Sequence, residues 1–121
     1  MTDPIFGELI SKYTRAQAVE DGLQFDVTDD PGAKVYKTAV YVTAALHAEL
    51  KRGQGKDAET YSARLWDVCY LLATFARDRS DGGRECDVKV GRRRLHVRGE
   101  CGPVDIDDPR PAITLGFPSD F

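Results

Sequence analysis

The residues of this chain with the greatest potential for chemistry are two histidines and three cysteines. Cys86, His96 and Cys101 carry thiol and imidazole groups, which are the usual protein ligands of zinc. The gaps of nine and four residues between them match no compact zinc signature. We therefore interpret them as small apolar thiols in or near strands and a surface histidine, and we expect no metal or other cofactor.

Nucleophilic catalysis needs a thiol or hydroxyl beside an orienting base, and His47 and His96 are the imidazoles that could supply one. Neither lies in a known catalytic motif, and the sequence has no GxGxxG fingerprint and no phosphate-binding loop. We therefore predict no enzymatic activity. A small hydrolase or transferase with an unfamiliar site around His96 and Cys101 is the weakest alternative.

A run of arginines is the electrostatic feature that most suggests a ligand. It consists of Arg92, Arg93 and Arg94, with Arg98 four residues further on. Guanidinium groups pair with phosphate in a bidentate way, so this loop could bind a nucleic-acid backbone. It could equally bind an acidic protein, or be a solvated hairpin turn whose charges pair with acidic residues of the same chain.

An acidic segment near the C-terminus offers the opposite charge. Asp105, Asp107 and Asp108 resemble part of a calcium-binding loop, but the glycine and distal glutamate of an EF-hand are missing. We interpret them as a solvated turn or as a second partner-binding face, a rival to the arginine run. Against nucleic acid stand the net charge of −3 and the lack of an aromatic and basic stacking platform in the sequence.

Length and composition indicate what kind of protein carries these residues. With 121 residues and 41% hydrophobic content, the chain should form one domain over residues 1–121 with one core. No apolar stretch approaches the roughly 20 residues of a membrane helix, and the first residues lack a secretory signal pattern. An odd number of cysteines is typical of a reduced protein, so we expect a cytoplasmic location.

The first part of the chain predicts a short helix and a strand. Thr14 and Gln17 have the spacing of a capping box, which predicts a helix that begins at Arg15 and ends near Gly22. Apolar and polar residues then alternate over 23–28, the pattern of a strand with one buried face.

Two longer helices are predicted in the middle of the chain. The first should run from Lys37 to about Arg52, because its apolar and small residues recur at steps of three and four. The second begins near Asp57 or Thr60, and we expect it to be the most buried element. The face of the first comprises Val40, Thr43, Leu46 and Leu50, and the stripe of the second comprises Tyr61, Leu65, Val68, Leu72 and Phe75, widened by Trp66, Cys69 and Ala73.

The last third has the alternation typical of strands. Strands are predicted over 86–90, around 95–97 and over 113–117, with a turn at Gly91 and a break at 99–103. The order of elements predicts an α+β fold, in which a small antiparallel sheet packs against two longer helices and a short helix precedes them. Whether exposed edge strands pair into a homodimer is left open.

One stretch of the sequence resembles a known family. Residues 10–22, Ile-Ser-Lys-Tyr-Thr-Arg-Ala-Gln-Ala-Val-Glu-Asp-Gly, followed by Asp-Val-Thr at 26–28, resemble the opening of a family of small uncharacterised proteins. Such proteins are often carried by bacteriophages, plasmids and other mobile elements. Weaker similarity continues through 42–45, 64–68 and 113–115. The resemblance implies an accessory protein of a mobile element in a bacterial cytoplasm, and it transfers no catalytic residue.

The leading prediction is a non-enzymatic protein-binding module whose partner is a host protein or protein complex. Inhibition of a host defence complex, as anti-CRISPR proteins do, is the concrete version that the resemblance implies. The alternative is a nucleic-acid-binding or regulatory protein that uses Arg92, Arg93, Arg94 and Arg98 on phosphates. Binding to a membrane is not expected.

Overall fold

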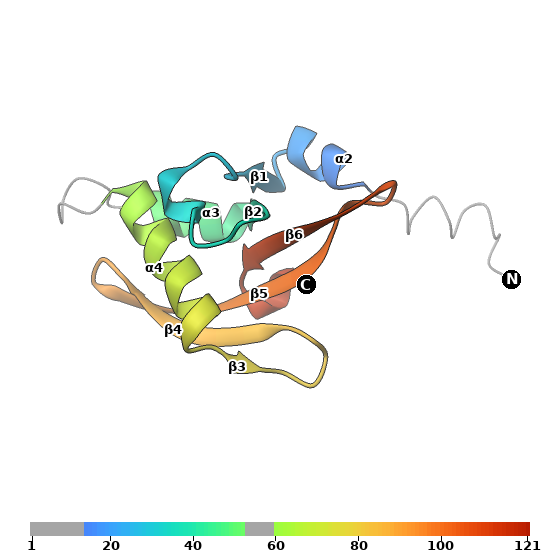
Figure 1. Cartoon of the computed structure of the whole chain (residues 1–121). Helices are drawn as coiled ribbons and strands as arrows, with labels where there is room; N and C mark the ends of the chain where they lie inside the picture. The colour runs from blue at the N-terminus through green and yellow to red at the C-terminus, as the bar shows by residue number, and fades with distance from the viewer. Residues whose placement is uncertain (1–13, 53–59) are drawn as a thin grey trace, which may run out of the picture.

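A six-stranded sheet organises the chain, with its strands in the order β1-β2-β6-β5-β4-β3 (Figure 1). The computed structural model describes residues 14–52 and 60–121. The strands are β1 (Gln24–Asp26), β2 (Ala39–Thr43), β3 (Arg77–Asp78), β4 (Arg84–Val90), β5 (Arg93–Asp105) and β6 (Asp108–Gly116). The helices are α2 (Arg15–Glu20), α3 (Ala44–Lys51) and α4 (Tyr61–Thr74), with short 3-10 turns η1 (Pro31–Ala33) and η2 (Pro118–Asp120).

The sheet is mixed, and the prediction of a small antiparallel sheet packed against two longer helices is wrong. β2 pairs with β6 in parallel, while the other neighbouring strands pair antiparallel. The chain does combine helices with a sheet, as an α+β fold requires, but the sheet dominates. Among residues 14–52 and 60–121, none of the helices could span a lipid bilayer.

The unexpected strand β2 explains most of this difference. Val40 and Val42 are fully buried on the core side of the strand, and the β-branched side chains suit the extended backbone. The helix expected from residue 37 therefore begins only at Ala44. Thr43 caps it, because its Oγ1 accepts a hydrogen bond from the N–H of Leu46 at 3.4 Å.

Strand β5 is longer than predicted. It runs without interruption through 99–103, where the sequence indicated a break, and it pairs with β4 on one side and β6 on the other. Pro103 lies opposite Pro111, and the register shifts between Pro103 and Asp105. A bulge of this kind accommodates proline within a ladder, so the chain turns only after Asp105.

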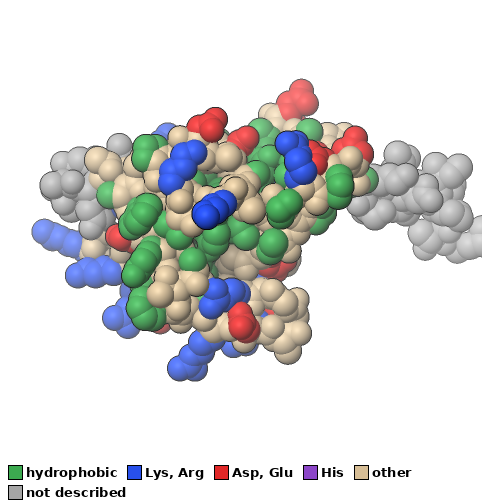
Figure 2. Space-filling view, viewed as in Figure 1, with side chains coloured by type: hydrophobic (Ala, Val, Ile, Leu, Met, Phe, Trp, Pro, Cys, Tyr) green, Lys and Arg blue, Asp and Glu red, His purple; other side chains and the backbone are tan. Residues whose placement is uncertain are grey.

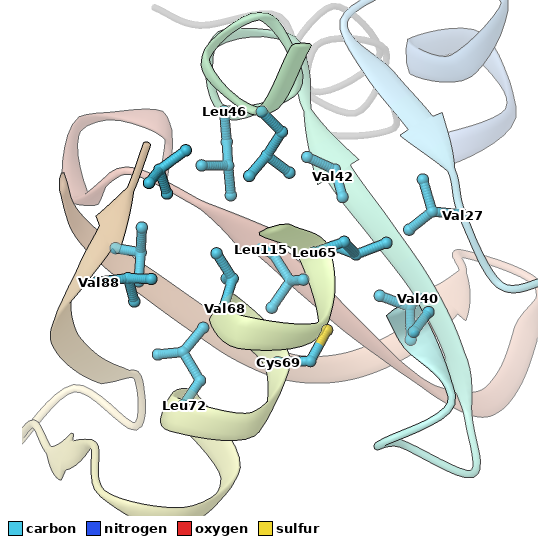
Figure 3. Packing of buried hydrophobic residues seen from close by; sticks show 14 residues of the cluster. Val27, Val40, Val42, Leu46, Leu65, Val68, Cys69, Leu72, Val88 and Leu115 are labelled. Atoms are coloured by element: carbon cyan, nitrogen blue, oxygen red, sulfur yellow. The ribbon is translucent and has the colours of Figure 1, made fainter. Parts of the chain in front are cut away.

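The core lies between the sheet and helices α3 and α4 (Figure 3). α4 contributes Leu65, Val68, Cys69 and Leu72, all at most 1% exposed. Burial of each such leucine or valine side chain stabilises the fold by roughly 1.5–3 kcal/mol. The stripe predicted for this helix is therefore confirmed at its centre. These side chains pack among Val40, Val42, Leu46, Leu50, Val88, Val90, Val97 and Leu115.

A buried arginine joins the two helices. The side chain of Arg64 is 1% exposed, and its Nη1 donates to the carbonyl oxygens of Leu50 and Arg52 at 3.1 and 2.6 Å. Those carbonyls belong to the end of α3, where helix carbonyls lack intrahelical partners. A cation at this position also suits the negative end of the helix dipole, so Arg64 fixes α4 against α3.

Candidate functional site

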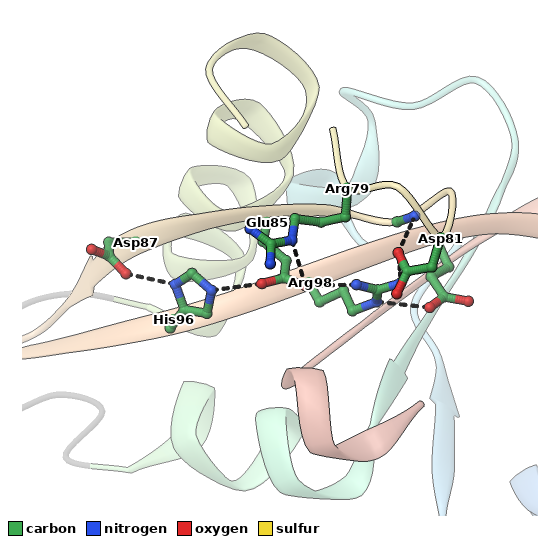
Figure 4. Close-up of polar contacts among 8 residues, drawn as sticks. Arg79, Asp81, Glu85, Asp87, His96 and Arg98 are labelled. Carbon is green, nitrogen blue, oxygen red and sulfur yellow. Dashed lines mark hydrogen bonds and ion pairs between the residues drawn. The ribbon is translucent and has the colours of Figure 1, made fainter. Parts of the chain in front are cut away.

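Arg98 does not belong to an exposed arginine loop, because three carboxylates surround it on the outer face of the sheet (Figure 4). Its side chain is only 7% exposed. The guanidinium pairs with Asp81 at 2.7 Å, Glu100 at 2.7 Å and Glu85 at 2.6 Å, and these acids raise the pKa of Arg98. This arginine is engaged within the fold and is not available to a phosphate group.

His96 extends this ionic cluster along β5 (Figure 4). Its Nε2 lies 2.8 Å from Glu85 Oε1 and its Nδ1 lies 2.8 Å from Asp87 Oδ1. Carboxylates accept hydrogen bonds, so the imidazolium can donate from both ring nitrogens. Hydrogen bonds to Glu85 and Asp87 raise the pKa of His96, and His96 together with Arg98 lowers the pKa of Glu85. The arrangement favours the protonated ring and engages both of its nitrogens with carboxylates.

The other three arginines lie at the tip of the β4–β5 hairpin and are divided between its two sides. Arg93 forms an ion pair with Glu49 of α3, and its Nη2 donates to the carbonyl oxygen of Glu49 at 3.0 Å. Arg92 and Arg94 are exposed. Arg94 shares the outer face with His96, because side chains alternate along a strand. Only two of the four predicted arginines therefore face solvent together.

The three acidic residues lie together at the turn between β5 and β6, where Asp105 pairs with Asp108 across the ladder. Asp105 binds the first turn of α2, since its carboxylate accepts from the N–H groups of Arg15 and Ala16 at 3.0 Å each. Backbone N–H groups, foremost that of Ile106, lower the pKa of Asp105. Asp108 pairs with Arg110, which lowers the pKa of Asp108 to about 2. Asp107 is exposed in the turn between β5 and β6. Asp105 and Asp108 thus hold local structure, whereas Asp107 faces solvent.

The sulfur and imidazole groups are not brought together. Cys86 pairs with Val97 across the hairpin, and Asp87 pairs with His96, so Cys86 and His96 point to opposite faces of the sheet. Cys101 lies five residues from His96 along β5, about 16 Å away at 3.3 Å per residue. No group of three metal-ligating side chains occurs in the residues that the structure describes.

The second histidine is packed between two aromatic rings. His47 stacks on Phe25 with ring centroids 3.8 Å apart, and its Nδ1 lies 2.8 Å from the hydroxyl oxygen of Tyr61. Burial and the charge of Lys51 lower the pKa of His47. These contacts join β1, α3 and α4, so His47 serves packing.

A groove of about 750 Å³ lies beside α2 and the C-terminal residues. Its charged groups are already engaged within the chain. Arg15 donates to the carbonyl oxygens of Val104 and Pro103, Glu100 pairs with Arg98, and Asp120 accepts from the hydroxyl of Thr43 at 2.8 Å. The groove thus combines satisfied polar groups with the exposed apolar side chains of Leu23, Ile106 and Phe121.

A row of exposed aromatic side chains on α4 is the feature that the sequence analysis missed. Trp66 is 44% exposed, Tyr70 is 45% exposed and Phe75 is 67% exposed. We call these three residues the aromatic face. Figure 2 shows hydrophobic side chains gathered over α4, with Lys and Arg side chains around them. The prediction that Trp66, Ala73 and Phe75 belong to the buried stripe is wrong.

Helix geometry accounts for the aromatic face. Trp66 and Tyr70 are four residues apart and therefore lie above one another on the helix surface. Phe75 follows the last helical residue as the C-cap, and its ring meets that of Tyr70 at a centroid distance of 6.3 Å. Apolar residues occupy more of this helix than one core face can bury. The sequence therefore did contain a signal for the aromatic face, namely more apolar residues than one side of the helix can hold.

Charged residues lie near the aromatic face. The turn η1 packs closely on α4, since a Cβ on Gly32 would lie 3.0 Å from the backbone nitrogen of Trp66. The exposed Lys34 and Lys37 follow in the same loop, and the exposed Arg77 comes two residues after Phe75. Asp67 on α4 and Asp78 after Arg77 are exposed as well, so the aromatic face is apolar at its centre and has charged residues of both signs around it.

Comparison of the chain with models of known protein families, with curated proteins and with solved structures finds no match.

Proposed function

We propose that this chain is a non-enzymatic protein-binding module that contacts its partner through the aromatic face of α4. The observation that carries the proposal is the exposure of Trp66, Tyr70 and Phe75 in one row. Large aromatic side chains bury much apolar area at low entropic cost, and Trp and Tyr are enriched among the residues that dominate binding energy. The exposed apolar area favours a partner with an apolar groove.

The partner that we propose is a host protein or protein complex in a bacterial cytoplasm. Inhibition of a host defence complex, as anti-CRISPR proteins do, is the specific form of this proposal. It rests on the resemblance of residues 10–22, of which 10–13 lie outside the described residues. The aromatic face supports protein binding in general and does not identify the partner.

The alternative, nucleic-acid binding, has less support. The exposed rings could stack on bases, but Arg92 and Arg94 are not part of the same surface. Arg94 lies on the outer face of the β4–β5 hairpin, whereas Val88, Val90 and the core side of the hairpin pack towards α4. A single-strand platform needs basic and aromatic groups along one path, and this separation argues against it.

A binding experiment from bacterial lysate tests the proposal. The wild-type chain, the double variant Trp66→Ala/Tyr70→Ala and the double variant Arg92→Ala/Arg94→Ala are each immobilised. All replaced side chains are exposed, so the three proteins should have the same far-UV circular dichroism. We expect a stoichiometric protein partner on the wild type and on the arginine variant, and its loss from the aromatic variant.

Two results would contradict the proposal. One is a partner that the aromatic variant retains and the arginine variant loses. The other is the absence of any stoichiometric protein partner while the immobilised chain is folded. Titration of DNA and RNA at two salt concentrations tests the alternative, because each phosphate contact makes binding weaker at high salt. Salt-dependent affinity that Arg92→Ala/Arg94→Ala abolishes would favour nucleic acid.

A further inference from the structure

One edge of the sheet is left half covered. β3 has two residues and pairs only with Arg84 and Glu85 of β4. β4 continues to Val90, so the segment 86–90 extends beyond β3. In the described residues no strand lies alongside this segment on the side away from β5. An uncovered strand edge offers its backbone groups to another strand.

The hairpin turn shows which backbone groups face this edge. Gly91 and Arg92 form a two-residue turn between Val90 and Arg93, which makes Val90 and Arg93 a hydrogen-bonded pair. Hydrogen-bonded and non-hydrogen-bonded pairs alternate along an antiparallel ladder. The N–H and C=O groups of Asp87 and Lys89 therefore point away from β5, towards the open edge.

The side chains of these two residues carry opposite charge and share the outer face of the sheet. Asp87 contacts His96 at 2.8 Å. Lys89 lies directly across from Arg94, and none of the described residues forms an ion pair with either of them. Two like charges opposite each other destabilise a strand pair. Lys89 thus lies at the open edge without an ion pair in the described residues that would offset this repulsion.

We propose that two copies of this chain associate through β4, in antiparallel register with Val88 of one copy opposite Val88 of the other. In this register the outward-facing backbone groups of Asp87 meet those of Lys89 in the second copy. Each Asp87 side chain also lies opposite a Lys89 side chain, next to Arg94. The association joins the two sheets into one and places both α4 helices on the same side of it.

The charge pattern selects this register among the symmetric ones. A shift that pairs Lys89 with Lys89 of the second copy would place like charges opposite each other. A shift in the other direction would pair Lys89 with Glu85, whose edge β3 already occupies. The register centred on Val88 pairs both outward-facing residues, and it pairs them with opposite charges.

Charge-reversal variants test the association by sedimentation equilibrium. The wild type should sediment with twice the 13.4 kDa of one chain. Lys89→Glu and Asp87→Lys should each weaken dimerisation by about tenfold or more, since two cross-strand pairs become repulsive. A mixture of the two variants should form a heterodimer, because each of the two cross-strand pairs then joins one acidic and one basic side chain. Lys37→Glu, which changes the net charge equally at an exposed loop, should leave the dimer intact.

Hydrogen exchange gives a second measurement that does not depend on the variants. The amides of Asp87 and Lys89 should exchange slowly at high protein concentration and faster on dilution. A wild-type chain of 13.4 kDa at every concentration measured would overturn the proposal. So would a dimer that Lys89→Glu leaves unchanged. Trp66→Ala should not affect the dimer, so this proposal and the proposed function can fail separately.

Discussion

A Cβ atom added to Gly83 would lie 2.2 Å from Cζ of Arg98, so the backbone at Gly83 passes directly against the guanidinium. The loop before β4 thereby closes one side of the ionic cluster. Its Asp81 carboxylate accepts from the N–H of Gly83 at 3.3 Å and from Arg98 at 2.7 Å. The glycine is required for space, because its φ lies outside the left-handed region.

Replacement of Gly83 by alanine should destabilise the protein through Arg98. The added methyl group must displace a guanidinium that three carboxylates hold in place. We expect the melting temperature to fall by about 4 °C or more. Gly102→Ala is the control, since nothing lies within 4 Å of a Cβ at that position. In an Arg98→Ala background the effect of Gly83→Ala should largely disappear, and an undiminished effect would show that the clash lies elsewhere.

Replacement of Gly32 by alanine should have a larger effect, because the clash is with backbone. A Cβ there would lie 2.3 Å from the carbonyl oxygen of Ser62. This oxygen belongs to the backbone of α4, so it can move only if the helix shifts. We expect the free energy of unfolding in urea to fall by about 1–3 kcal/mol with an unchanged m-value. Stability equal to that of the wild type would contradict the close packing of η1 on α4.

The two histidines should titrate on opposite sides of their ordinary pKa of 6.5. Hydrogen bonds to Glu85 and Asp87 raise the pKa of His96, whereas burial and the charge of Lys51 lower the pKa of His47. An NMR titration of the ring protons measures both values, and His96→Gln assigns the signals. Equal pKa values for the two rings would contradict the described environments.

These shifts also predict how stability depends on pH. His96 binds its proton more tightly in the folded state, so its contribution is fully present below pH 6.5 and is lost as the pH rises through its raised pKa. His47 disfavours its proton in the folded state, so it costs stability as the pH falls below 6.5. Urea denaturation of His96→Gln should therefore show a larger loss at pH 6 than at pH 9. An equal loss of unfolding free energy at both pH values would contradict an ionic role of His96.

Local sequence patterns predicted those parts of the fold that depend on neighbouring residues. The capping box of Thr14 and Gln17 is present, with Thr14 Oγ1 accepting from the N–H of Gln17 at 3.0 Å. The hairpin turn at Gly91 is also confirmed, and its φ of 60° lies in the left-handed region that favours glycine. Spacing also predicted the burial of Leu65, Val68 and Leu72 on α4, although not the burial of Arg64.

The predictions that failed concern features that depend on contacts with other segments of the chain. Val40, Thr43, Leu46 and Leu50 fit a helical period, but Val40 and Val42 alternate as well, and their pairing with β6 selected the strand. The arginine run gave no sign that Arg98 would meet Asp81, Glu85 and Glu100, which come from three segments. Sequence alone therefore could not separate Arg98, which is engaged within the fold, from Arg92 and Arg94, which face solvent.

Quenching of tryptophan fluorescence by acrylamide tests the central claim most directly, because Trp66 is the single tryptophan of the chain. Its 44% exposure predicts efficient quenching in the free protein. The same measurement is repeated in the complex with the partner that the wild-type chain captures, after the partner's own tryptophan emission is subtracted. Binding should shield Trp66 from acrylamide and shift its emission to shorter wavelength. Quenching and emission that stay the same in the complex would show that the partner binds elsewhere, and the aromatic face would not be the binding site.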